Sequence, residues 1–151
     1  MIDPKIYRND DVAVGDLQST AKGSGARKNG GKVMLHQIPF HLMGGVARVL
    51  MGGMQKYKPL NWAKGMDWSV SYDCALRHLF KWWYAREDND PESGEHHLDH
   101  VMCNVLFLKH YLTYYPEGDD RPPEGMFTTE DIDKLFDADE YCKRNQLGPY
   151  S

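Results

Sequence analysis

The sequence predicts an all-α fold, an antiparallel helical bundle that is completed by association of copies of the chain. Three observations support this prediction. Apolar residues recur at three- and four-residue intervals over three long segments. Clusters of proline, glycine and acidic residues separate the second and third segments, and such a short connection makes two helices antiparallel neighbours. Hydrophobic residues make up 41% of the 151 residues, which suffices for one modest core but leaves aromatic side chains that three helices cannot cover.

The composition also limits the function. Eighteen basic and 22 acidic residues give a formal charge of -4, the wrong sign for stable binding to nucleic acid. Three widely spaced cysteines suit neither a disulfide framework nor a zinc ribbon, and they fit a reducing cytosol. No apolar run approaches the roughly 18 residues of a membrane span, and the N-terminus lacks the apolar stretch of a signal peptide. We therefore expect a cytoplasmic protein with no membrane partner.

The N-terminal part is expected to be an arm followed by a helix. Residues 1–32 end in a segment rich in Gly, Ser and Lys that has little to bury, which predicts a flexible arm. Pro39 suits a first helical turn, and helical spacing predicts a helix from there to about Tyr57. Two glycine pairs, at residues 44–45 and 52–53, cost about 1 kcal/mol per glycine relative to alanine. Close approach of another helix or of a ligand would offset that cost.

Two further helices complete the predicted core, residues 33–115. The first covers about Ser69 to Arg86, with Ser69 as a candidate cap, and its apolar stripe consists of Tyr72, Leu76, Leu79 and Trp83. The next covers about His96 to Tyr114, and its apolar stripe consists of Leu98, Val101, Val105, Leu108 and Leu112. Residues 116–151 are expected to form an appendage with one short acidic helix.

The connection between these last two helices is a candidate metal site. Its carboxylates are followed directly by imidazoles, and the group consists of Glu87, Asp90, Glu92, Glu95, His97 and His100. At about 100° per residue, His97, His100 and Asn104 share one face of the helix. Carboxylates select Mg²⁺ or Mn²⁺, and an imidazole ligand shifts the preference towards Mn²⁺. An ordinary solvated turn has the same composition, so the pattern alone leaves both interpretations open.

A second group of residues suits a nucleotide. Lys56, Lys58, Asn61 and Trp62 combine positive charge, an amide and an aromatic ring, which can hold a phosphate and stack on a base. A surface loop anchored by one Trp is the alternative. Asp73 and Arg77, four residues apart, are further candidates for substrate binding, although they could simply pair with each other.

Three ordered motifs resemble a known family. They are K-Y-x-x-x-N-W-x-x-G from Lys56, R-H at Arg77 and His78, and E-x-x-D-x-E-S-G-x-x-H-L-x-H from Glu87 to His100. Over residues 32–114 the chain resembles the phage-type dATP/dGTP diphosphohydrolases, the MazZ-like members of the all-α MazG-like nucleoside triphosphate pyrophosphohydrolases.

The resemblance implies a fold related to MazG-like and dimeric dUTPase enzymes, a homodimer or homotetramer, and Mg²⁺ or Mn²⁺ beside the triphosphate of the substrate. The superfamily's metal motifs, E-x-x-E and E-x-x-D on two helices, have no clean copy at the expected helical positions of this chain. Transfer of the family site puts Glu87, Asp90 and Glu92 on the metal as the catalytic carboxylates. His97 and His100 then bind metal directly or hydrogen-bond to those carboxylates.

The resemblance implies cleavage of dGTP or dATP to the monophosphate and pyrophosphate, a reaction that could supply phage synthesis of DNA containing 2-aminoadenine. In that mechanism Glu87 or Glu92 accepts a proton from water, and Lys56 and Arg77 balance charge on the phosphates. The expected base pocket consists of Trp62, Ile38 and Val46.

Two alternatives belong to other classes. An HD-type metal phosphohydrolase needs an adjacent His-Asp pair, and the sequence contains no such dipeptide. A non-catalytic helical binding or regulatory module would leave the acidic corner as a solvated cap and use the tryptophans for core or interface.

Overall fold

The computed structural model describes residues 16–17, 27–28 and 32–148 and divides the chain into two compact units, residues 1–41 and 42–151. In the first unit, β1 (Asp16–Leu17) pairs antiparallel with β2 (Arg27–Lys28). The 3₁₀ turn η2 (Leu35–Gln37) follows. Most of the expected N-terminal arm, residues 1–32, lies outside the described residues.

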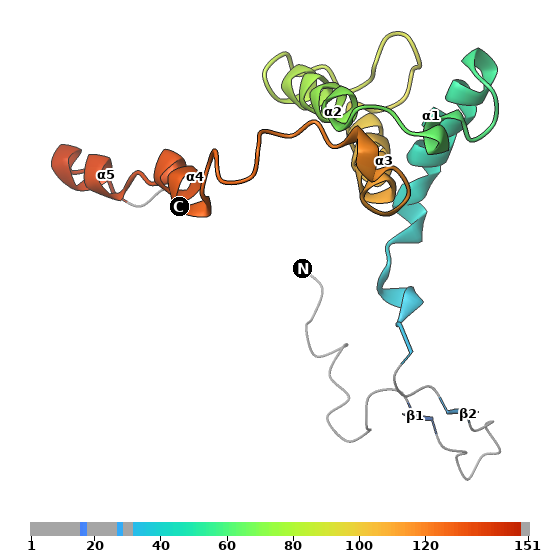
Figure 1. Ribbon diagram of the computed structural model, residues 1–151, viewed down its shortest axis with the longest axis horizontal. Coiled ribbons are helices and arrows are strands. Elements are labelled where there is room, and N and C mark those ends of the chain that lie inside the picture. Colours follow the sequence, from blue (N-terminus) through green and yellow to red (C-terminus); the bar gives the residue numbers. More distant parts are fainter. Residues whose placement is uncertain (1–15, 18–26, 29–31, 149–151) are drawn as a thin grey trace. The chain divides into compact units, whose positions relative to one another are not determined.

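The second unit is helical, which confirms the predicted all-α fold class (Figure 1). The 3₁₀ turn η3 (Phe40–Leu42) leads into it. Its long helices are α1 (Met43–Lys56), α2 (Trp68–Trp83) and α3 (His97–Tyr114). Its shorter elements are the 3₁₀ turns η4 (Asn61–Lys64) and η5 (Pro116–Gly118) and the helices α4 (Thr129–Phe136) and α5 (Asp139–Asn145).

Helices α2 and α3 run antiparallel, as their short connection predicts. At one end of the pair, the Trp68 indole Nε1 donates a hydrogen bond to the carbonyl oxygen of Tyr115 over 3.1 Å. At the other end, the imidazole of His78 lies against those of His97 and His100. The hydrogen bond at one end and the ring contacts at the other together fix how the two helices pair.

The predicted helix ends differ from the observed ones by a few residues. Helix α1 begins at Met43 rather than Pro39, because the residues before it form the tighter turn η3. Helix α2 ends at Trp83, and Arg86, the expected last residue, has a left-handed φ of 55° that no α-helix continues. His96 caps α3, since its side chain accepts a hydrogen bond from the backbone N–H of Leu98.

The sequence made Ser69 a candidate cap of α2, but Ser69 does not cap this helix. The N-cap position belongs to Asp67, and Ser69 lies in the first turn of the helix. There its backbone N–H donates to the carboxylate of Asp120 over 2.9 Å, and its hydroxyl donates to the same group. The segment after α3 is thereby tied to the start of α2.

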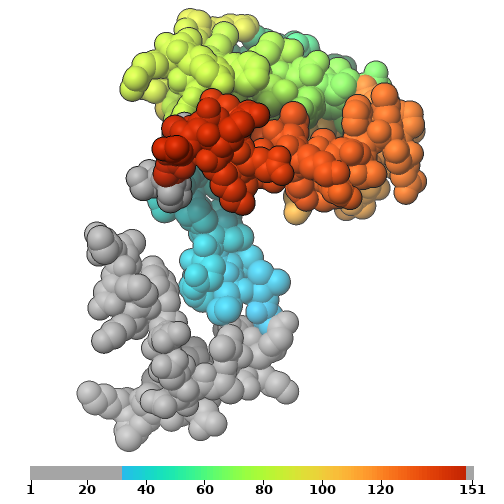
Figure 2. Space-filling view, turned by 90° about the vertical axis from the view of Figure 1, so that its left-hand side faces the viewer, coloured from blue at the N-terminus to red at the C-terminus, as the bar shows by residue number. Residues whose placement is uncertain are grey.

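The predicted apolar stripe of α2 is only partly buried, since Leu76 and Leu79 are half-buried. The buried residues of the helix are Trp68, Ser71 and Ala75, whereas Tyr72 and Trp83 of the stripe are 56% and 67% exposed. Small residues on the inner face let α3 approach closely, so the helix buries little side-chain volume there. The light-green surface of α2 in Figure 2 therefore includes large apolar side chains.

Helix α3 shows a similar shift of its inner face. The face it buries carries His97, Cys103, Asn104 and Tyr111, while Val105 and Leu112 of the predicted stripe are more than half exposed. The polar residues can be inside because they hydrogen-bond to one another or to the backbone. The predicted stripe was therefore only partly right, since its members Leu98, Val101 and Leu108 are half-buried.

Close approach explains one glycine of the two pairs. Gly45 is buried, and a Cβ at that position would collide with the carboxylate of Asp99 on α3. A Cβ at Gly52 or Gly53 would meet nothing within 4 Å. The predicted packing reason therefore applies to the first pair and not to the second.

The C-terminal segment contains two short helices where one was expected. Thr128 and Asp131 form a reciprocal capping box that starts α4. Extended Asp137 ends that helix, and α5 begins two residues later.

All three cysteines are free thiols. In the part of the chain that is described, no helix is both long and apolar enough to cross a bilayer.

Candidate metal and nucleotide site

The segment between α2 and α3 is an ordered turn that buries a carboxylate. The backbone N–H of Asp90 donates to the carbonyl oxygen of Glu95 over 2.8 Å, and that of Gly94 donates to the carbonyl oxygen of Asp90 over 2.8 Å. Gly94 has a φ of +74°, a conformation that glycine adopts without strain. His97 is fixed in turn, because its N–H donates to the carbonyl oxygen of Asp88 over 2.8 Å. The result is a buried Asp90, only 8% exposed.

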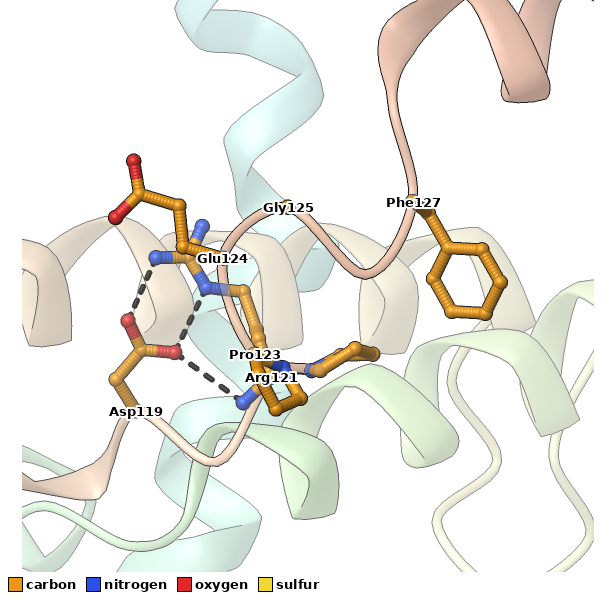
Figure 3. Close-up of a pocket in the computed structure, with 7 residues that line it drawn as sticks. Asp119, Arg121, Pro123, Glu124, Gly125 and Phe127 are labelled. Atoms are coloured by element: carbon orange, nitrogen blue, oxygen red, sulfur yellow. Dashed lines mark hydrogen bonds and ion pairs between the residues drawn. The ribbon is translucent and has the colours of Figure 1, made fainter.

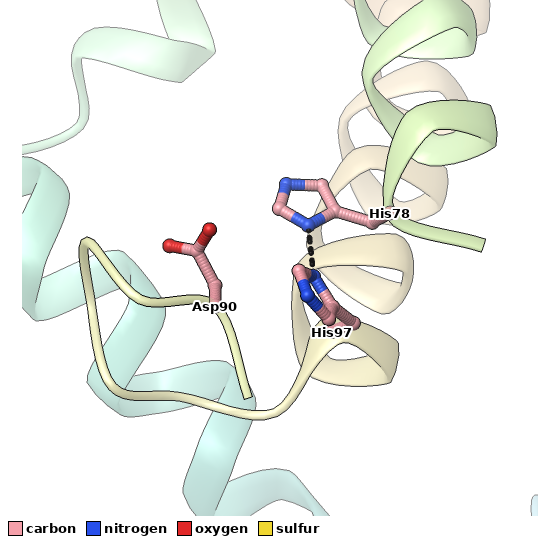
Figure 4. A group of neighbouring side chains, drawn as sticks. All are labelled: His78, Asp90 and His97. Carbon is pink, nitrogen blue, oxygen red and sulfur yellow. Dashed lines mark hydrogen bonds between the residues drawn. The ribbon is translucent and has the colours of Figure 1, made fainter. Parts of the chain in front are cut away.

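Three side chains from three parts of the chain meet above this turn (Figure 4). His78 comes from α2, Asp90 from the turn and His97 from the start of α3, and one ligand atom from each lies within 4.8 Å of the others. The Nδ1 atoms of the two histidines are 2.7 Å apart. We call these three residues the His-Asp-His cluster.

Glu87 fixes the orientation of His97. The Nε2 of His97 lies 2.8 Å from the Oε1 of Glu87. An ionised carboxylate only accepts hydrogen bonds, so Nε2 of a neutral His97 carries the proton and its Nδ1 presents a lone pair towards His78. A carboxylate behind an imidazole is a common arrangement for metal-binding histidines, because it holds the tautomer and the ring.

Burial and neighbouring charges set the protonation of the cluster. Burial, reinforced by the nearby imidazoles of His100 and His97, lowers the pKa of His78 to about 4. Burial would raise the pKa of Asp90, but two hydrogen bonds from Ser93 and the adjacent imidazoles outweigh it and lower that pKa. At neutral pH the cluster therefore presents a neutral His78 and an ionised Asp90, the forms in which both residues bind metals.

His100 borders the cluster. Its ring stacks on that of His78 with centroids 4.3 Å apart, and its Nε2 lies 2.8 Å from the Ser93 hydroxyl and 3.8 Å from an Asp90 oxygen. Burial lowers the pKa of His100, although Asp90 opposes the shift. His100 is therefore held in place by contacts on two sides.

A cavity of about 300 Å³, here called the polar cavity, opens beside the cluster. It is lined by Arg77, His78, Lys81, Asp90, Glu92 and His100. Two permanent cations thus face two carboxylates across a small space. Such a cavity suits a ligand that carries negative charge together with a cation.

A second cavity of about 450 Å³, here called the apolar cavity, lies between α1, α3 and the segment that connects α1 to α2. Its walls include Leu50, Met54, Trp62 and Phe107, and the Trp62 and Phe107 rings stack with centroids 5.1 Å apart. His100 lines both cavities. The two spaces are therefore neighbours.

The structure brings most of the predicted site residues to these two cavities. Asp90, Glu92, Arg77 and His100 line the polar cavity, and Asn61 and Trp62 line the apolar one. Glu87 and His97 lie against the His-Asp-His cluster. Lys56 forms an exposed ion pair with Glu92 at the edge of the polar cavity.

Three predicted residues are not at either cavity. Asp73 is exposed on α2, and no ion pair with Arg77 forms within residues 32–148. Val46 is buried in the core, where its carbonyl oxygen accepts a hydrogen bond from the thiol of Cys103. Ile38 belongs to the first unit, whereas both cavities are built from the second.

The sequence analysis did not select His78 or Lys81, although both line the polar cavity. Arg77, His78 and Lys81 occupy neighbouring positions on the last turns of α2, which signals a shared surface. Asn104 was placed on the histidine face but given no role, and it lines the apolar cavity. Its helical spacing from His97 and His100 was the available signal.

A further cavity follows α3 and is lined by residues 119–127 (Figure 3). There Arg121 pairs with Asp119 over 2.6 Å, and its guanidinium lies 4.8 Å from the centroid of the Trp68 ring. Arg121 and Asp119 thus satisfy each other, and Glu124 is the one charged lining residue without an ion pair among the described residues. The chemistry is concentrated at the other two cavities.

Comparison with known proteins identifies the family of the chain. Residues 22–121 match the family described as dATP/dGTP diphosphohydrolase, N-terminal. A protein of Salmonella phage PMBT28 named dATP/dGTP diphosphohydrolase is similar to this chain, with 34% identity over 98 residues, which are 65% of this chain and 33% of the relative. The chain therefore spans about a third of the length of that curated relative. No solved structure matches the chain.

Proposed function

Because the chain belongs to the dATP/dGTP diphosphohydrolase N-terminal family, we propose that it hydrolyses dGTP and dATP to the nucleoside monophosphate and pyrophosphate. The observation that carries the proposal is the His-Asp-His cluster beside a cavity that also holds Arg77 and Lys81. A triphosphate needs both cations and metal-binding groups in one place. The matched region, residues 22–121, contains all of them.

The cluster suits a divalent cation. Two imidazole nitrogens and one carboxylate oxygen converge, and such a mixed set favours Mn²⁺ over Mg²⁺. His78, Asp90 and His97 would hold the ion, and Glu87 would keep the lone pair of His97 directed at it. When bound, the cation would neutralise phosphate charge and lower the pKa of water.

The chain's own groups would bind the phosphates and move the proton. Arg77 and Lys81 would donate hydrogen bonds to phosphate oxygens. Glu92 lines the cavity outside the His-Asp-His cluster, so it would accept the proton of the attacking water. The water oxygen bonds to the α-phosphorus, the bond from that phosphorus to the bridging oxygen breaks, and pyrophosphate leaves.

Lys56 would respond to the substrate. In the structure it pairs with Glu92, and the pair raises the pKa of Lys56 through the hydrogen bond and the opposite charge. An incoming triphosphate would compete for Lys56, leaving the Glu92 carboxylate available to the water. The proposed response of Lys56 to the substrate uses only the charges of Lys56 and Glu92, which are already paired at the edge of the polar cavity.

We also propose that copies of the chain associate, as a homodimer or a homotetramer. Large apolar side chains are exposed on two adjacent helices of the second unit, namely Tyr72, Phe80 and Trp83 on α2 and Val105 and Leu112 on α3. Exposed apolar area of this kind is typical of an interface. Light scattering should give a multiple of 17.4 kDa, and a monomer at micromolar concentration would contradict association.

Within a cell the reaction would belong to the cytoplasm, where deoxynucleotides are found. In a phage-infected host it would lower the dATP and dGTP pools and release dGMP for nucleotide synthesis.

The test of the proposal identifies both the products and the phosphorus that is attacked. The chain is incubated with each deoxynucleoside triphosphate and Mn²⁺ in heavy-oxygen water, and the products are resolved by phosphorus NMR and mass spectrometry. We expect pyrophosphate and a heavy-oxygen label in the monophosphate. Inorganic triphosphate, label in the pyrophosphate, or no turnover of any nucleotide would each contradict the proposal.

A further inference from the structure

The apolar cavity contains one buried amide. Asn104 is only 8% exposed and comes from the inner face of α3. Its Nδ2 donates a hydrogen bond to the carbonyl oxygen of His100 over 2.8 Å, which fixes the plane of the amide. Its Oδ1 accepts no hydrogen bond from another described residue, and it keeps accessible surface, since it is not among the buried side-chain atoms that lack a partner. An acceptor that is fixed in place and has no donor in the described part of the chain is available to a ligand that supplies one.

The rim of the same cavity stores backbone strain. Leu60, which lines it, has a left-handed φ of 57°, a conformation that side-chain-bearing residues rarely adopt. Its side chain is exposed at the cavity, as are those of Met54 and Tyr57. Strain of this kind is concentrated at ligand sites, where the surroundings hold it.

We propose that the apolar cavity binds the nucleobase of the substrate and that Asn104 Oδ1 accepts a hydrogen bond from the base. The inference rests on the proposed function, since it places one nucleotide across both cavities. His100 lines both cavities, so the part of the nucleotide between base and phosphates would lie beside it. Stacked rings and aliphatic side chains suit the faces of a purine, and the single fixed acceptor suits its edge.

Because the Asn104 Oδ1 position is fixed, it would distinguish bases by the hydrogen-bond donors on their edges. Adenine presents its 6-amino group, and guanine presents N1–H and its 2-amino group. Unsubstituted purine offers none of these donors and would leave Oδ1 without a hydrogen bond from the base. The base that lacks the donor is therefore rejected by loss of one hydrogen bond.

The test uses nucleosides, so that it needs neither phosphate nor metal. Deoxyadenosine and purine deoxyriboside, which lacks the 6-amino group, are titrated against the chain while NMR follows the Trp62 indole and the Asn104 amide. We expect both ligands to shift the Trp62 signal and deoxyadenosine to bind about fivefold more tightly, as one hydrogen bond allows. In Asn104→Leu, which has a similar shape, the two ligands should bind equally.

Asn61→Leu is the matched control, because Asn61 is the other amide at the cavity. The preference for deoxyadenosine should persist in that variant. A preference that persists in Asn104→Leu, or that is lost in Asn61→Leu instead, would overturn the role of Asn104. Nucleoside shifts confined to residues outside the cavity would overturn the base site.

The two proposals fail separately. If Asn104-dependent nucleoside binding is found without release of pyrophosphate, the proposed reaction is wrong and the base site stands. If pyrophosphate is released with no dependence on Asn104, the base site is wrong and the reaction stands. Thermal melting of Asn104→Leu, followed by circular dichroism, establishes that the variant is folded under the conditions of the titration.

Discussion

The two cavities of the helical unit share His100 but are built in opposite ways. In the polar cavity both carboxylates have partners, Lys56 for Glu92 and Ser93 for Asp90, which hold them in place. The apolar cavity has aliphatic walls, stacked rings and one fixed acceptor, Asn104 Oδ1, without a donor among the described residues. Under the two proposals above, the polar cavity would hold the phosphates and the apolar cavity would select the base.

The largest expected effect comes from removing the buried charge of the polar cavity. Asp90→Asn keeps the shape but replaces the carboxylate of the His-Asp-His cluster by a neutral amide. Because the site would lose its anionic ligand, pyrophosphate release should fall by at least about 100-fold. Initial rates with saturating dGTP and Mn²⁺ measure it.

Asp133→Asn is the control for that variant, since Asp133 is an exposed carboxylate on α4. Its rate should equal that of the wild type. Equal rates for wild type and Asp90→Asn would show that the polar cavity is not the reaction site.

The second prediction concerns the packing of α1 on α3, the two helices that line the apolar cavity. Gly45→Ala would push a Cβ into the carboxylate of Asp99, which should destabilise the fold by about 1–3 kcal/mol. Gly52→Ala, in open space on the same helix, should stabilise it by about 0.5–1 kcal/mol. Denaturant midpoints measure both. A Gly45→Ala variant as stable as Gly52→Ala would mean that α1 does not pack on α3 in this way.

Glu87→Gln tests the positioning of His97. A neutral amide no longer dictates which nitrogen of His97 carries the proton, so the affinity for Mn²⁺ should fall by about 10- to 100-fold. The maximal rate at saturating Mn²⁺ should change less than the affinity. A variant that loses maximal rate with unchanged Mn²⁺ affinity would identify Glu87 as a group that acts in the reaction rather than on the imidazole.

The smallest effect is expected for Lys56→Ala. The ion pair with Glu92 is exposed, so its loss should leave the denaturant midpoint nearly unchanged. Because the substrate would lose one cation at the cavity edge, KM should rise several-fold, and the rise should shrink as salt is added. An unchanged KM at low salt would remove Lys56 from the binding site.

The sequence predicted the fold class better than it predicted the inner faces of the helices. Helical spacing and breaker clusters are local properties, and they correctly indicated three core helices. Which face packs inward depended on close approach at Ser71 and Ala75 and on hydrogen-bonded polar groups such as Asn104. The spacing of apolar residues contains no information on close approach or on hydrogen-bonded polar groups. It therefore placed Trp83 and Leu112 inside, although both are exposed.

The same difference between local and tertiary information explains which site residues the sequence indicated. Glu87, Asp90 and His97 stand close together in the sequence, and the motif that contains them was sufficient to select them. His78 lies on another helix and reaches the cluster only because α2 and α3 run antiparallel. Such a contact depends on the register between two helices, which spacing within one segment does not determine. Val46 was selected for the base pocket by its apolar side chain, which suits a core equally, and it lies in the core.

The most direct test of the central claim is a Mn²⁺ titration followed by electron paramagnetic resonance, with a non-hydrolysable dGTP analogue present. The His-Asp-His cluster predicts that the wild-type chain binds the ion and that Asp90→Asn binds it at least about tenfold more weakly, while Asp133→Asn is unchanged. Equal affinity of the wild type and Asp90→Asn, or no binding by the wild type, would contradict the claim that this cluster is a cation site.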